Sequence, residues 1–164
     1  MCYADYKNEN DEVIEELARI NMNAPDEIGD GLLSVMATTG RVALCKKLME
    51  IGLSPDIHFG GYDSLQNCIA EVGRNSREML ATLLKGSKYS IKEQRGMGTT
   101  LLHCAVSWGK IDIAKFLISQ GASMLDMDID CFKVIDLEAP EDIKNELCNY
   151  EANRGFARVR YKNI

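Results

Sequence analysis

The chain has 164 residues, a length that fits one domain with a continuous hydrophobic core. Its hydrophobic content of 46% and charged content of 27% are ordinary for a globular protein. The formal net charge of −6 argues against a nucleic-acid-binding surface, which needs clustered basic side chains, and favours a protein partner with a neutral or basic surface.

The six cysteines lie too far apart for a zinc knuckle, whose ligands stand two to four residues apart. Several fall within helical apolar patterns, where a reduced cysteine behaves as a small hydrophobic residue. The chain begins without the apolar run of a signal peptide, and no segment approaches the roughly 20 apolar residues of a membrane span. We therefore expect an intracellular, cytoplasmic protein.

The first predicted element is an amphipathic helix between Asn8 and Ile20, with Val13, Leu17 and Ile20 at helical spacing. Its other face is acidic, which suits the first helix in a stack of repeated helical units, because the outer side of such a helix faces water. We expect an N-terminal cap over about residues 8–28.

Residues 29–57 predict a pair of helices joined by a turn at Gly40 and ended at Gly52. The next unit, residues 58–94, shows the same pattern with Asp63 as the residue that caps its first helix. Compared with its neighbours it has extra residues, which we assign to loops over 73–77 and 85–94.

The clearest pattern lies in residues 95–127. Thr100 is a helix N-cap type, apolar residues at helical spacing follow it, and Gly109 allows the turn to a second helix that ends at Gly121. Beyond it, Pro140 predicts a helix over 141–150 that completes a C-terminal cap over 128–153. Residues 154–164 form a short basic tail, which we expect to be solvated or docked on the acidic body rather than bound to RNA or an anionic membrane.

The segment from Thr100 to Ala122 resembles an ankyrin repeat, whose signature is T-P-L-H-x-A with a period of about 33 residues. Thr100, Leu102, His103 and Ala105 occupy the signature positions, and Leu101 replaces the proline. The resemblance implies an all-α ankyrin-repeat solenoid of about four to five helix-turn-helix units with hairpin-like inter-repeat loops.

The resemblance also implies a function. Small ankyrin-repeat proteins bind partner proteins through the hairpin tips and the concave face of their first helices, without catalysis or a cofactor. We expect an inhibitor, an immunity-type or masking protein, or an adaptor. We further expect it to be monomeric alone and to bind no nucleic acid or membrane.

The resemblance places the candidate partner-binding residues at three kinds of position. The hairpin tips carry Ile28, Asp30, Phe59, Tyr62, Met97, Thr99 and Phe132; the first helices carry Thr38, Thr39, Glu71, Ser107 and Trp108; and Arg74 and Ile111 lie just beyond a turn. Because aromatic anchors dominate interface energetics, Trp108, Tyr62 and Phe59 are the expected hot patch. The alternative is that these aromatic side chains fold back to fill gaps in the degraded middle repeat.

Two features could instead indicate chemistry. His103 could be catalytic, but in this signature its ring can bond to the capping threonine and nearby backbone. Asp126, Asp128 and Asp130 match the first ligands of a calcium-binding EF-hand loop, yet the required glycine and glutamate positions hold Cys131 and Leu137. A metal-binding or enzymatic protein that uses the 126–130 loop, and a self-assembling scaffold, stay open as alternatives.

Overall fold

A computed structural model describes residues 12, 16, 32–57, 61–70 and 76–161, with side chains described up to residue 154. The predicted N-terminal cap therefore lies almost wholly outside the described residues. The chain divides into two compact units. The first comprises Met1–Ser90 and Arg95–Met97, and the second comprises Ile91–Gln94 and Gly98–Ile164.

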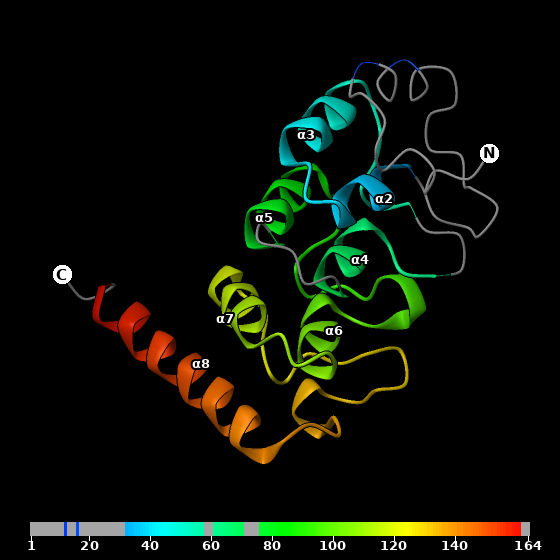
Figure 1. The fold of residues 1–164 in the computed structure, drawn as a ribbon. Coiled ribbons are helices and arrows are strands. Elements are labelled where there is room, and N and C mark those ends of the chain that lie inside the picture. Colours follow the sequence, from blue (N-terminus) through cyan, green and yellow to red (C-terminus); the bar gives the residue numbers. More distant parts are fainter. Residues whose placement is uncertain (1–11, 13–15, 17–31, 58–60, 71–75, 162–164) are drawn as a thin grey trace. The chain divides into compact units, whose positions relative to one another are not determined.

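The described part of the first unit consists of two helix pairs (Figure 1). Helices α2 (Leu32–Thr38) and α3 (Val42–Glu50) form the first pair, and α4 (Ser64–Ala70) and α5 (Ser76–Gly86) form the second. Helix α2 packs against α4, and α3 packs against α5. Their apolar faces meet in a core whose fully buried members include Met36, Leu44, Leu48, Leu65, Ile69 and Leu80.

The second unit contains α6 (Leu101–Ser107), α7 (Ile111–Gln120), the short 3-10 helix η3 (Val134–Asp136) and α8 (Glu141–Tyr161). Helix α7 lies between α6 and α8 in the packing order, and η3 contacts α6. Another 3-10 turn, η2 (Gly96–Gly98), crosses the boundary between the units. Leu102, Leu117 and Leu147 are fully buried at the centre of this unit. The described residues contain seven α-helices and no strand, which confirms the predicted all-α class.

Glycines close the helices where the sequence predicts them. Gly109 ends the turn after α6 with a φ of +66°, and Gly121 caps α7 with a φ of +112°. Their predicted counterparts, Gly40 and Gly52, also have positive φ, at +73° and +108°. A side chain strains this left-handed backbone, so the glycines set where each helix stops.

Two helices are longer than predicted. Helix α5 includes Ser76, Arg77 and Lys85, which the sequence analysis assigned to loops. Its apolar residues keep helical spacing, and the acidic Glu78 in the first turn favours the helix N-terminus.

Helix α8 runs past the predicted end at Tyr150 and continues to Tyr161. Most of the predicted basic tail, residues 154–164, is therefore helical. Arg154 helps to hold this extension, because its guanidinium donates to the Ser119 carbonyl at 3.3 Å and to the Tyr150 hydroxyl at 3.4 Å. Within the described part of the chain, none of the helices combines the length and apolar character that crossing a bilayer requires.

Replacing a leucine at the centre of the second unit should test its packing. Leu102→Ala and Leu117→Ala should each lower the free energy of unfolding by roughly 2–5 kcal/mol, because each leaves a cavity. The exposed Met127→Ala should change it by less than about 0.5 kcal/mol. Urea unfolding followed by circular dichroism measures all three, and equal losses at buried and exposed sites would contradict the packing.

Burial should also control the reactivity of the thiols. It raises the pKa of Cys45 and of Cys68 to about 12, whereas Cys131 is exposed. Because the thiolate is the reactive form, iodoacetamide at pH 8 should label Cys131 and leave Cys45 and Cys68 unmodified in the folded protein. Peptide mass spectrometry with and without urea measures this. Native labelling of Cys45 as fast as that of Cys131 would contradict the described core.

Candidate partner-binding surface

The buried first turn of α4 supports the candidate surface of the first unit. Asp63 caps this helix as predicted, since its Oδ1 accepts from the backbone N–H groups of Leu65 at 3.0 Å and Gln66 at 2.9 Å. In return, the Asp63 backbone N–H donates to Oε1 of Gln66 at 3.1 Å. The two side chains therefore form a reciprocal capping box.

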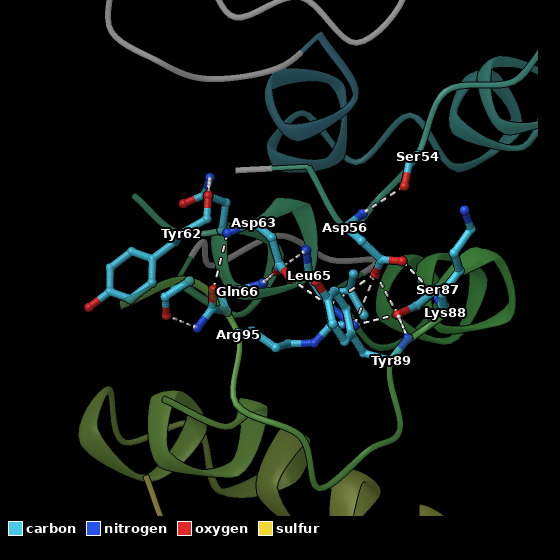
Figure 2. Close-up of polar contacts among 12 residues, drawn as sticks. Ser54, Asp56, Tyr62, Asp63, Leu65, Gln66, Ser87, Lys88, Tyr89 and Arg95 are labelled. Carbon is cyan, nitrogen blue, oxygen red and sulfur yellow. Dashed lines mark hydrogen bonds and ion pairs between the residues drawn. The ribbon is translucent and has the colours of Figure 1, made fainter. Parts of the chain in front are cut away.

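Arg95 neutralises the buried charge of this cap (Figure 2). Its Nη1 donates to Oδ2 of Asp63 at 2.5 Å and its Nη2 donates to Oδ1 of Asp56 at 3.1 Å. The side chains of Arg95 and Asp63 are 1% and 0% exposed. Burial raises the pKa of the Asp63 carboxyl, and the Arg95 charge opposes part of that rise. An isolated carboxylate at this depth would be strongly unfavourable, so the ion pair is a condition of this fold.

The same cluster fastens the segment that precedes Arg95. Ser87 accepts from Nη2 of Arg95 and donates to Oδ1 of Asp56 at 2.5 Å, while the Lys88 backbone N–H donates to Oδ2 of Asp56 at 2.7 Å. The Arg95 guanidinium also lies 4.9 Å from the ring centre of Tyr89, in cation–π contact. The insertion expected over 85–94 thus begins with residues that contribute directly to the cluster.

A hydrogen bond from Gln66 then positions the tip that follows. Its Nε2 donates to the Gly96 carbonyl at 2.8 Å. A side chain at Gly96 would collide with the Gly61 carbonyl and with Gln66, so only glycine allows this close approach. The next residue, Met97, has a φ of +58° and a 61% exposed side chain.

His103 performs the corresponding task in the second unit. Thr100 caps α6 by accepting from the His103 backbone N–H at 3.3 Å. The His103 ring contacts the Thr100 hydroxyl through Nδ1 at 2.7 Å and the Phe132 carbonyl through Nε2 at 3.0 Å. A carbonyl can only accept, so Nε2 donates to it, and the Thr100 hydroxyl is the partner of Nδ1. The predicted structural role of His103 is confirmed.

Gln66 and His103 are therefore equivalent. Each stands three residues after its capping residue, and each donates to a loop carbonyl 30 or 29 residues further along the chain. Neither the role of Gln66 nor the Arg95 cluster was predicted from the sequence. Asp63 itself could have indicated the cluster. The repeat over 95–127 has Thr100 at the same capping position, and an aspartate there carries a charge that needs a cationic partner when it is buried.

The structure places the predicted binding residues at different levels of exposure. In the first unit Tyr62 and Met97 are exposed, whereas Thr38 and Thr39 are half-buried. In the second unit the exposed predicted residues are Ser107 and Phe132, and the half-buried ones are Thr99, Trp108 and Ile111. The remaining predicted residues, Ile28, Asp30, Phe59, Glu71 and Arg74, lie outside the described residues.

Thr38, Thr39 and Trp108 also have structural roles. The Thr38 and Thr39 hydroxyls donate to the Val35 and Met36 carbonyls at 2.8 and 2.7 Å, so they help to end α2. Trp108 is the C-cap of α6, where its backbone N–H donates to the Cys104 carbonyl at 3.0 Å. Its side chain is half-buried, so it presents less apolar surface than an exposed anchor would.

The largest exposed apolar side chains of the second unit lie elsewhere. Leu125, Met127, Ile129 and Phe132 follow α7, and the sequence analysis named only Phe132 among them. The neighbouring carboxylates bond to the loop itself, since Asp126 accepts from the Ser123 N–H at 2.7 Å. Among the described residues, no group of three or more His, Cys, Asp or Glu side chains is placed to hold a metal ion.

Comparison with protein families supports the repeat architecture. A family model described as ankyrin repeats (3 copies) matches residues 33–128. This match spans the three helix pairs from α2 to α7 and covers more than half of the chain. A comparison with curated proteins gives no match.

Removing the buried cation should test the cluster of the first unit. Arg95→Leu should lower the free energy of unfolding by about 3–5 kcal/mol, because it leaves the Asp63 carboxylate buried without a counter-charge. The matched control is Lys92→Leu, since the Lys92 side chain is 55% exposed and lies 3.6 Å from Asp126. That change should alter the free energy of unfolding by less than about 1 kcal/mol. Urea unfolding of both variants decides, and equal losses would contradict the role of Arg95.

Proposed function

The chain belongs to the ankyrin-repeat family, and from this premise we propose that it binds a protein partner and acts by occupying or masking the partner's surface. Ankyrin repeats generally mediate protein–protein interaction and are typically non-catalytic. Inhibitor, immunity-type or masking protein, and adaptor are the roles that fit a chain whose matched part consists of repeats alone.

The observation that carries this proposal is the anchoring of exposed tips by hydrogen bonds from the buried residues Gln66 and His103. Met97 follows the carbonyl that Gln66 binds, and Phe132 carries the carbonyl that His103 binds. Both side chains are more than half exposed, at 61% and 59%. A tip whose backbone is already held loses little conformational entropy when it docks, so its contacts contribute more fully to affinity.

The proposed contact residues come from both units. In the first unit they are Tyr62 and Met97, with Thr38 and Thr39 contributing mainly their methyl groups. In the second unit they are Thr99, Ser107, Trp108, Ile111 and Phe132. The resemblance to other ankyrin repeats adds Ile28, Asp30, Phe59, Glu71 and Arg74 as proposed contacts.

Two physical features support a binding role over catalysis. Both ring nitrogens of His103 are engaged and its side chain is 2% exposed, so it has no access to a substrate. The net charge of −6 supports a partner with a neutral or basic surface, because opposite charge speeds encounter. The same charge weighs against nucleic acid or an anionic membrane as the partner, and we propose a chain that is monomeric alone.

Affinity capture from lysate of the native source, followed by quantitative mass spectrometry, tests the proposal. The wild-type chain should enrich a small set of proteins, and a Trp108→Ala, Tyr62→Ala double variant should lose them, because two aromatic contacts disappear. A matched control is Lys46→Ala, Glu50→Ala, which changes exposed residues on a second helix without changing net charge. Circular dichroism must first show that both variants are folded. An identical protein set from all three chains would contradict the proposed contact residues.

A further inference from the structure

Residues 125–133, here the 125–133 loop, follow α7 and expose apolar side chains while a carboxylate is largely buried. Its apolar residues Leu125, Met127, Ile129 and Phe132 are exposed by 61%, 50%, 66% and 59%. Aspartates alternate with the first three, and yet the Asp126 side chain is only 10% exposed. In this loop the apolar side chains face solvent while a charged side chain turns inward.

Hydrogen bonds hold the carboxylates of the loop. Asp126 accepts from the Ser123 N–H at 2.7 Å, and Asp128 accepts from the N–H groups of Asp130 at 3.0 Å and Phe132 at 2.9 Å. These carboxylates bind backbone N–H groups of the loop and of Ser123 just before it, and Asp126 also lies 3.6 Å from the Lys92 ammonium. The backbone turns at residues 124–125 and again at 129–130, and the apolar side chains between and beside these turns are exposed.

The 125–133 loop is also fastened to the rest of the second unit. An isolated antiparallel bridge joins Met127 to Lys133. The Ile129 backbone N–H donates to the Gly98 carbonyl at 2.9 Å, and the Phe132 carbonyl accepts from His103 at 3.0 Å. A side chain at Gly98 would collide with the Ile129 side chain, so this pairing depends on glycine. The exposed apolar side chains therefore lie on a backbone that these hydrogen bonds hold in place.

This arrangement does not serve the stability of the isolated chain. Apolar side chains stabilise a fold when they leave water, and these four large ones remain largely in water. Exposed apolar patches rimmed by polar residues mark interaction sites on folded domains, and these four side chains lie within eight consecutive residues beside exposed acidic ones. The geometry therefore points to an occupant that covers the loop.

The charge around the loop specifies that occupant. Residues 125–138 contain five acidic residues and one lysine, a formal net charge of −4 within a chain of net charge −6. Asp130, Asp136 and Glu138 are exposed. Nucleic acid and anionic lipid are repelled by this charge, and so is the same loop of a second copy. A segment with cationic side chains is attracted to it.

We propose that the 125–133 loop binds a protein segment in which large apolar side chains are interspersed with Lys or Arg. The apolar side chains of that segment pack against Leu125, Met127, Ile129 and Phe132, and its cations lie near Asp130 and Glu138. This inference rests on the proposed protein-binding function, which it deepens by naming the chemistry of the partner and the loop that binds it.

Selection from a displayed library of random peptides tests the proposal without a known partner. The full chain is the bait, the enriched peptides are synthesised, and their Kd values are measured by isothermal titration calorimetry. Peptides that are cationic and rich in large apolar residues, with affinity that falls as salt rises, are the expected result. Enriched peptides that are neutral or acidic would overturn it.

Two loop variants and one control then locate the site. Ile129→Ser, Phe132→Ser should raise the Kd of the selected peptides at least about tenfold, because two apolar contacts are lost. Asp130→Asn, Glu138→Gln should raise it severalfold and flatten the salt dependence. Asp112→Asn, Asp142→Asn removes the same charge from exposed positions on α7 and α8 and should leave the Kd unchanged. An equal effect of the charge control would show a general attraction to an acidic protein and would overturn the proposal.

The remaining outcomes separate this inference from the proposed function. Peptides that bind both loop variants normally, but lose affinity with Trp108→Ala, would overturn the loop as the site and leave protein binding intact. A library that yields no binder would overturn the loop proposal, while specific capture of a partner from lysate could still support the broader function. Light scattering that shows a dimer, lost with Ile129→Ser, Phe132→Ser, would identify a second copy as the occupant and also overturn the proposal.

Discussion

The structure depends on one recurring hydrogen bond, which runs from the first turn of a repeat's first helix to the carbonyl of a loop about thirty residues later. Gln66 makes it to Gly96 in the first unit, and His103 makes it to Phe132 in the second. Helices α4 and α6 have seven residues each, and helices this short are marginally stable by themselves. The bond links a helix start to a distant loop, so local capping and long-range packing reinforce each other.

A change at the capping position has consequences far along the chain. Where the second unit has Thr100, which is neutral, the first has Asp63, whose burial requires a counter-charge. Arg95 supplies it from 32 residues away, and the preceding segment supplies Ser87 and Tyr89 to hold the guanidinium. The longer connection of the middle repeat is thereby part of the same electrostatic arrangement.

The helix pairs, their closing glycines and the caps at Asp63 and Thr100 were predictable because each depends on neighbours in sequence or on helical spacing. His103 was predictable because its partners belong to a known signature. Arg95 was not, since its role depends on two carboxylates brought together only by folding. The extension of α8 was not predicted for a similar reason, because the bond from Arg154 to the Ser119 carbonyl joins α8 to α7 and is not visible in the local pattern.

The hydrogen bonds that shape the loops also determine which side chains remain for binding. In the 125–133 loop Asp126 and Asp128 accept from backbone N–H groups, while the apolar residues beside them are exposed to solvent. In the first unit the Gln66 bond likewise leaves Met97 exposed beyond a fixed carbonyl. In the proposed binding role, a partner would meet apolar side chains whose backbone needs no further ordering, which lowers the entropic cost of docking. In this proposal the polar contacts that stabilise the fold also position the side chains for recognition.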